Sequence, residues 1–177
     1  KVLELTLHNG CDPRSGKQLG PRTGEPATFA TFDQLLDAFN TQLRYFVDIK
    51  IRGNNVIDQL YAQNIPVPFL SLLIDDCIEK RLDYHAGGAR YNTSYIQGVG
   101  IGSITDSLAS IKYNIYEENR FSMAELIEAI DSNFAKADRL RSICVAESPK
   151  YGNDDNRADD LMRAVFELYY NAVEGRP

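Results

Sequence analysis

Apolar residues recur at helical spacing along most of the chain, and the longest such run lies in its first half. Between Phe32 and about Ala62 they follow one another at intervals of three and four residues, the period of a helix with one buried face. Thr31 and Gln34 have the form of a capping box at the start of this run. Gly53 lies near its middle and costs up to about 1 kcal/mol relative to alanine. We therefore expect a kink or a close helix contact at Gly53.

Shorter helical runs lie on both sides of this long one. Val2–His8 is predicted to be the end of a helix that Asn9-Gly10 closes. Residues 11–26 are broken by proline and glycine and are predicted to be a loop. The same spacing predicts further helices over residues 69–82, 103–116, 123–136, 137–146 and 156–173, the third of them opened by a capping box of Ser122 and Glu125.

One segment is predicted to be a strand. The run ARYNTSYIQGVG ends at Gly100, is rich in residues that favour strands and is bounded by glycines. We expect the only substantial strand at residues 91–100. The fold class is therefore predicted to be α/β, mainly helical with one or two strands. So little sheet among so many helices would make a poor self-contained domain.

Charge and cysteine usage exclude several classes of function. The 177 residues carry a net charge of -6, whereas binding to nucleic acid needs clustered lysine and arginine. No apolar run approaches the roughly 18 residues of a membrane span, and no secretory leader is recognisable. Three cysteines without CxxC spacing argue against a disulfide framework or a zinc site and favour a reducing cytoplasm. The first and last residues, Lys1 and Pro177, suggest a piece of a longer chain.

A glycine-rich stretch, GVGIGSITDSLASIK (residues 98–112), is the first candidate for a binding loop. A dinucleotide fingerprint requires a third glycine where Ser103 stands, and no lysine occupies the Walker position. Glu117 and Glu118 lie at a suitable distance for a ribose acid, but a polar stretch and a new helix cap stand there instead of a strand. We therefore expect a structural strand-to-helix turn in which Ser103 or Thr105 caps the helix.

A thiol and a carboxylate stand two residues apart at Cys77 and Glu79. A nucleophilic or radical cysteine needs an enclosed pocket and an activating neighbour. Helix positions two apart point to different faces, so these side chains are not expected to meet. We interpret Cys77 as a buried helix cysteine beside solvated acids.

Neither histidine is predicted to be catalytic or to bind a metal. His8 and His85 lack a second good ligand in an HExxH-like arrangement, although Asp83 lies near His85. An acidic cluster lacks the alternating spacing of a calcium loop and fits charge compensation at a helix N-terminus better. This cluster comprises Asp154, Asp155, Asp159 and Asp160. The residues alone therefore predict no catalytic, no cofactor-binding and no metal-ligating site.

Four long stretches carry a family resemblance. In chain order they read LELTLHNGCDPRSGKQLGPRTGEP, IDDCIEKRLDYHAGGARYN, YIQGVGIGSITDSLASIKYN and PKYGNDD. They resemble the glycyl radical enzymes of the pyruvate formate-lyase-like family, and most of all its dehydratase branch. DIKIRGN (Asp48–Asn54), GGARYNTSYIQGVGIG and FELYYNAVEGRP favour one member of that branch over its glycerol and choline relatives. The resemblance spans essentially all 177 residues.

The resemblance implies the glycyl radical enzyme α/β barrel, two parallel half-sheets wrapped in helices. Two loops meet inside it, one with a Gly-Cys-x-Glu motif for the thiyl cysteine and one with an Arg-Val-x-Gly-Tyr motif for the radical glycine. We expect the first just upstream of this chain and the second far downstream. Asp76-Cys77-Ile-Glu79 imitates the first motif but lacks its glycine. Residues 1–177 are thus expected to be an internal part of the family's domain, lacking both catalytic loops.

For the intact enzyme the resemblance implies radical elimination of water. A separate S-adenosylmethionine-dependent activase with an iron–sulfur cluster installs the glycyl radical, and this segment is expected to bind no cofactor. The cysteine thiyl takes a hydrogen from a small-molecule substrate, and a glutamate assists the loss of water. The implied partners are this radical-activating enzyme and a second subunit of a homodimer. A cytoplasmic location is expected, with no nucleic-acid or membrane partner.

Two alternatives stay open on the sequence alone. One is another branch of the family, such as a diol dehydratase or an arylacetate decarboxylase. The other is a non-catalytic helical interaction module, which the acidic charge and the lack of a site favour. A Gly-Cys-x-Glu motif in the flanking sequence would exclude this module.

Overall fold

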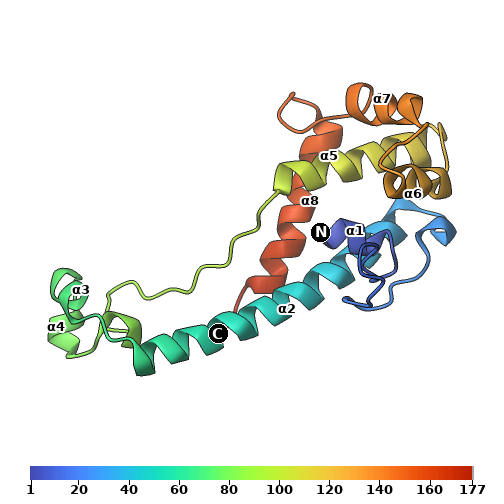
Figure 1. Ribbon diagram of the computed structural model, residues 1–177. Coiled ribbons are helices and arrows are strands. Elements are labelled where there is room, and N and C mark those ends of the chain that lie inside the picture. The colour runs from blue at the N-terminus through green and yellow to red at the C-terminus, as the bar shows by residue number, and fades with distance from the viewer. Residues whose placement is uncertain (177) are drawn as a thin grey trace. The chain divides into compact units, whose positions relative to one another are not determined.

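In the computed structural model, which describes residues 1–176, the chain forms two units (Figure 1). Unit 1 comprises residues 1–46 and 98–174, and unit 2 comprises residues 47–97 with Gly175 and Arg176. The helical elements are α1 (Val2–Thr6), η1 (Pro26–Thr28), α2 (Phe32–Asn64), α3 (Pro68–Leu73), α4 (Cys77–Lys80), η2 (Tyr84–Ala86), α5 (Ile101–Ile111), η3 (Lys112–Glu117), α6 (Met123–Asp131), α7 (Asp138–Ala146) and α8 (Asn156–Val173). Helix α2 begins in unit 1 and ends in unit 2.

The core of unit 1 forms where α5 packs against α8 (Figure 1). Leu108 of α5, Ala158 of α8 and Leu35 of α2 are each 0% exposed. Fully burying a leucine stabilises a fold by about 1.5–3 kcal/mol relative to leaving it in water. The rest of this buried cluster comprises Leu3, Leu7, Phe32, Phe39, Ala109, Ile111, Met123, Leu126, Leu161 and Val165.

Helix α2 confirms the long helix predicted from the sequence. Its first turn is capped by Thr31, whose Oγ1 accepts a hydrogen bond from the Gln34 N–H at 3.4 Å. The Gln34 side chain reaches one residue further back than a capping box requires and accepts from the Ala30 N–H at 2.7 Å. The helix continues through Gly53, where an added Cβ would meet nothing within 4 Å. The close helix contact expected at Gly53 is therefore absent from the described residues.

A buried polar network joins the end of α5 to the segment after α7. Asn114, in the π-helical turn η3, donates through Nδ2 to the Ser110 carbonyl and to Ser148 Oγ, both at 2.8 Å. The hydroxyls of Ser110 and Ser148 lie 2.9 Å apart. Because buried polar groups are costly unless they are hydrogen-bonded, these bonds fix the path of the chain around α7.

The single helix predicted over residues 69–82 is wrong, because α3 and α4 are separate. Asp76 adopts a left-handed conformation with φ 75 between them. Arg90 Nη2 donates to the Asp76 carboxylate at 2.6 Å, and the Arg90 N–H donates to the Asp75 carbonyl at 3.1 Å. These bonds from Arg90 stabilise the break. The apolar spacing within residues 69–82 cannot reveal them, because Arg90 lies outside that range.

Two predicted helix ends also differ from the structure. The helix expected over 103–116 begins at Ile101 and passes into η3 at Lys112. The helix expected to reach Lys136 ends at Asp131, because Asn133, Phe134 and Lys136 all have positive φ. By contrast α7 and α8 match the predicted ranges, and Gly10, at φ 79, closes α1 by donating to the Leu5 carbonyl at 2.7 Å.

The strand predicted at residues 91–100 is wrong for this chain. Residues 91–97 are irregular, and the one β-bridge among the described residues joins Cys11 to Gln18 in the loop after α1. A strand needs a neighbouring strand for its backbone N–H and C=O groups, and no described residue forms a β-bridge with this segment. The Tyr95 carbonyl instead accepts a hydrogen bond from Asn54 Nδ2 of α2 at 3.4 Å. Large side chains of this segment are exposed: Tyr91 86%, Tyr95 82% and Val99 90%.

Within the described residues, no helix has both the length and the apolar character that crossing a membrane requires.

Removing the Ser122 cap should destabilise unit 1. Ser122 Oγ accepts from the Glu125 N–H at 3.2 Å, and Glu125 Oε2 accepts from the Ser122 N–H at 2.7 Å. We predict that Ser122→Ala lowers the free energy of unfolding of this chain by about 1 kcal/mol, measured by urea denaturation. Ser122→Thr keeps the oxygen and should lose much less. Equal losses for the two variants would contradict the assigned cap.

Candidate functional site

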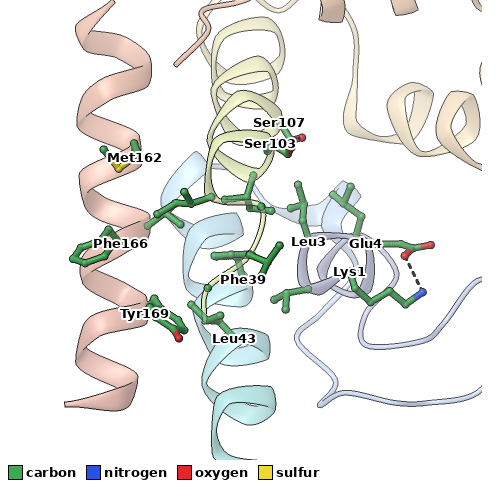
Figure 2. A pocket seen from close by; sticks show the side chains of 18 of the residues that line it. Lys1, Leu3, Glu4, Phe39, Leu43, Ser103, Ser107, Met162, Phe166 and Tyr169 are labelled. Atoms are coloured by element: carbon green, nitrogen blue, oxygen red, sulfur yellow. Dashed lines mark hydrogen bonds and ion pairs between the residues drawn. The ribbon is translucent and has the colours of Figure 1, made fainter. Parts of the chain in front are cut away.

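Unit 1 contains an apolar groove of about 740 Å³ (Figure 2). Helix α8 contributes Met162, Phe166 and Tyr169 to it, and α1 contributes Leu3 and Glu4 (Figure 2). Further apolar lining comes from Val2, Leu7, Phe39, Leu43, Val99, Ile101, Ile104, Ile130 and Val165. This groove was not predicted from the sequence, because its walls come from segments far apart in the chain. Each segment by itself predicts only an amphipathic helix.

Few polar groups face the groove, and local contacts engage several of them. Glu4 pairs with Lys1 at 2.8 Å, and Ser107 Oγ donates to the Ser103 carbonyl one turn away at 2.7 Å. Burial raises the pKa of the Tyr169 hydroxyl above its ordinary value. A groove of this composition suits apolar side chains better than a polar substrate.

His8, at the edge of the groove, links α1 to the end of α6. Its Nδ1 lies 2.7 Å from the Glu4 carbonyl, and its Nε2 lies 2.8 Å from Asp131 Oδ1. Both ring nitrogens therefore face acceptors, which only the doubly protonated ring satisfies. Burial lowers the pKa of His8, but the bonds to Glu4 and Asp131 outweigh it and hold that pKa above its ordinary value. The geometry indicates a structural ion pair.

The glycine stretch GVGIG is a turn into α5. Gly100 is the N-terminal cap residue, in the left-handed region at φ 86, and no side chain caps the helix. The expected cap by Ser103 or Thr105 is wrong, because both lie inside α5, and Thr105 Oγ1 donates back to the Ile101 carbonyl at 2.8 Å. A Cβ at Gly98 would lie 3.4 Å from the Tyr169 ring. The turn to a helix is confirmed, although no strand leads into it.

Cys77 is the first residue of α4 and is 2% exposed, which confirms the predicted buried helix cysteine. Glu79 on the same short helix is exposed. The acidic cluster was predicted to lie at a helix N-terminus, and one of its members does so as a cap. Asp155 accepts a hydrogen bond from the Arg157 N–H at 3.0 Å at the start of α8. No group of three or more potential metal-ligating side chains occurs among the residues that the structure describes.

Asp83 has a structural role that the sequence reasoning missed. Its carboxylate accepts hydrogen bonds from the Val67 N–H, the Ser71 hydroxyl and the His85 N–H, at 2.8, 2.8 and 3.0 Å. Burial raises the pKa of Asp83, but these three bonds outweigh it and the pKa lies below the ordinary value. Asp83 thus joins α3 to η2 and helps to hold unit 2 together. An aspartate two residues before the residue whose amide it caps is the local signal for such a turn.

The whole chain matches one family of known proteins. A model of the pyruvate formate lyase-like family matches residues 1–177, so the chain belongs to that family.

Two curated relatives are similar to this chain over nearly all of its length. Trans-4-hydroxy-L-proline dehydratase of Clostridioides difficile is 52% identical over 177 residues, which cover 100% of this chain and 22% of the relative. (2S)-3-sulfopropanediol dehydratase of Klebsiella oxytoca is 35% identical over 99% of this chain and 21% of its own length. The chain therefore spans about a fifth of the length of these relatives.

A solved structure agrees with this match. The crystal structure of hydroxyproline dehydratase from Clostridioides difficile with trans-4-hydroxy-L-proline bound superposes with a TM-score of 0.95 at 52% identity. The match covers 99% of this chain and 22% of that one.

The His8–Asp131 pair should make stability depend on pH. Because the folded state raises the pKa of His8, its contribution is complete below the unfolded pKa of about 6.5 and is lost as pH rises through the folded pKa. Asp131→Asn should reduce this dependence. Urea denaturation between about pH 5.5 and pH 9 measures it, and an unchanged profile in Asp131→Asn would contradict the pair.

Cys77 should be dispensable for chemistry in a full-length protein. Because the Cys77 side chain is buried, Cys77→Ala should lower the melting temperature. Because Glu79 is exposed and does not activate the thiol, turnover per folded molecule should stay close to the parent value. Cys144→Ala, at a half-buried cysteine of α7, is the matched control. Complete loss of turnover in Cys77→Ala without loss of stability would refute this interpretation.

Proposed function

We propose that this chain is a segment of a glycyl radical dehydratase, a lyase that removes water from trans-4-hydroxy-L-proline. The observation that carries the proposal is the 52% identity to trans-4-hydroxy-L-proline dehydratase across the whole segment, against 35% to the sulfopropanediol enzyme. DIKIRGN, GGARYNTSYIQGVGIG and FELYYNAVEGRP, the stretches that favour this member of the family, lie within that match.

In this proposal the segment is an internal part of the family's domain and carries no catalytic residue. In the intact enzyme a protein glycyl radical, generated by the activase, supplies the radical chemistry from loops outside these 177 residues. What the present residues contribute is structure: the packed core of α2, α5 and α8 and an apolar surface that excludes water from neighbouring segments. We propose further that the intact enzyme is a cytoplasmic homodimer that acts on a small molecule.

The segment at 91–99 fits this proposal as a strand whose partner strand is not among the described residues. Its composition favours a strand, its aromatic side chains are exposed, and no described residue forms a β-bridge with it. We propose that it becomes a strand of the α/β barrel when its neighbours from the rest of the enzyme are present. The turn at Gly100 then leads from this strand into α5.

A second candidate is another dehydratase of the same family. The 35% identity to an enzyme named for a sulfopropanediol supports it more weakly than the first candidate. Both reactions remove water, so they differ in the substrate that the pocket accepts. The helical interaction module remains the non-catalytic alternative.

The full-length protein, activated anaerobically with its activase, reductant and S-adenosylmethionine, should form a glycyl doublet in electron paramagnetic resonance. It should convert trans-4-hydroxy-L-proline to a pyrroline product at least about 100-fold more efficiently than glycerol, 1,2-propanediol or (2S)-3-sulfopropanediol. A doublet with a preference for a diol would support another branch, and absence of the doublet would support the module.

The 177-residue chain alone should give neither the doublet nor the product, because a stored radical and a relay cysteine are both required. A doublet, or product above the no-protein control, would overturn the assignment of catalysis to other segments.

A further inference from the structure

Helix α2 carries one apolar seam along its length. Positions separated alternately by three and four residues, the a and d positions of a heptad repeat, lie on one side of a helix and pack against another helix. In α2 they are Phe32, Leu35, Phe39, Gln42, Phe46, Ile49, Gly53, Val56 and Leu60. Only Gln42 is polar, and its buried side chain donates to the Pro21 carbonyl at 2.6 Å.

The two halves of this seam have opposite environments. In unit 1 its first members belong to the core, where Phe39 is 2% exposed. In unit 2 the seam continues with Ile49, Val56 and Leu60, which are 44%, 56% and 52% exposed. A contiguous apolar face on a helix marks an interface. The second half of the seam therefore has the pattern of a packing surface without a described partner.

Gly53 also indicates that another helix packs against this half of the seam. It occupies an a position in the exposed half, although glycine weakens a helix by roughly 0.8–1 kcal/mol relative to alanine. An added Cβ would meet nothing within 4 Å, so no contact in the described residues explains the glycine. A glycine in a helix seam lets the backbone of a second helix approach closely.

The charges beside the seam define the partner. Lys50 and Arg52 occupy the e and g positions, which flank the seam and determine which helix it accepts. Both are exposed, and no acidic residue occupies an e or g position between residues 45 and 64. Arg52 also pairs with Asp48 of its own helix at 2.7 Å, which leaves Lys50 as the stronger determinant.

We propose that the second half of α2 packs against one helix from the rest of the same polypeptide, a helix with an apolar seam and acidic flanks, with Gly53 at the closest approach. The proposal rests on the proposed function only in that the segment belongs to a longer protein. The relatives are long enough to supply such a helix, since this chain covers only 22% of trans-4-hydroxy-L-proline dehydratase. A second copy of α2 fits poorly, because it would place basic residues on both sides of the seam.

Cysteine accessibility in the full-length protein tests the proposal. Leu60→Cys places a thiol on the seam, and Ala62→Cys, two residues away on the opposite face, is the matched control. Each variant is labelled with a charged maleimide under native and denaturing conditions, and peptide mass spectrometry separates the new thiol from native cysteines. We expect Cys at position 60 to react at least about 100-fold more slowly in the native protein, and the control at position 62 to react freely.

The protein concentration identifies the source of protection. Protection that persists on dilution to monomer supports the proposal. Protection lost on dilution would indicate a second copy and overturn it, and so would rapid labelling at position 60. Turnover of the parent protein is measured separately, so failure of the hydroxyproline assignment would leave the labelling result interpretable.

Gly53→Leu provides a second test with opposite expected signs. At a solvent-exposed helix position leucine is the better helix former, so the substitution would raise the melting temperature of the full-length protein. At a close helix contact the added side chain clashes with the partner, and the melting temperature should fall by several degrees. A rise in Gly53→Leu would overturn the proposal.

Discussion

Mutual burial of the apolar faces of α5, α8 and the first half of α2 is the interaction on which unit 1 depends. Leu108, Ala158 and Leu35 have no exposed surface, so each is a site where lost volume is costly. The other features of unit 1 are arranged around this core. The turn at Gly100 directs the chain into α5, and the Ser110–Asn114–Ser148 network fixes the segment that leads back to α8.

Unit 2 buries few apolar side chains, namely Val47, Ile51, Cys77 and Ala89, and polar contacts link its segments. Asp83 accepts three hydrogen bonds that join α3 to η2, and Arg90 binds Asp76 at the break before α4. Each such bond contributes only about 0.5–3 kcal/mol net, while Phe69, Leu72 and Leu73 of α3 are 76%, 63% and 67% exposed. These apolar side chains of α3 are therefore not covered by any of the described residues.

Local signals in the sequence predicted the features that local physics determines. Ser122 and Glu125 gave the start of α6, and the apolar period gave α2 and α8, because caps and periodicity act within a few residues. The break at Asp76 was missed because Arg90, 14 residues away, stabilises it. The strand at 91–100 was predicted from composition, yet pairing requires a neighbouring strand that the described residues do not provide.

The same distinction explains what could be said of the site. Cys77 and the two histidines were predicted from their spacing alone to take no part in catalysis or metal binding, since such sites need a second group nearby. The groove beside Tyr169 could not be predicted, because α1, α2, α5 and α8 reach it only through tertiary packing. Family membership, by contrast, was readable from long motifs such as IDDCIEKRLDYHAGGARYN, because their specificity lies in the order of residues.

Amide hydrogen exchange on the 177-residue chain and on the full-length protein tests most directly whether this segment is internal to a larger enzyme. The account predicts that amides of residues 91–99, which have no partner strand here, exchange rapidly in the isolated chain and at least about 100-fold more slowly in the full-length protein. Equally rapid exchange of residues 91–99 in both proteins would contradict it.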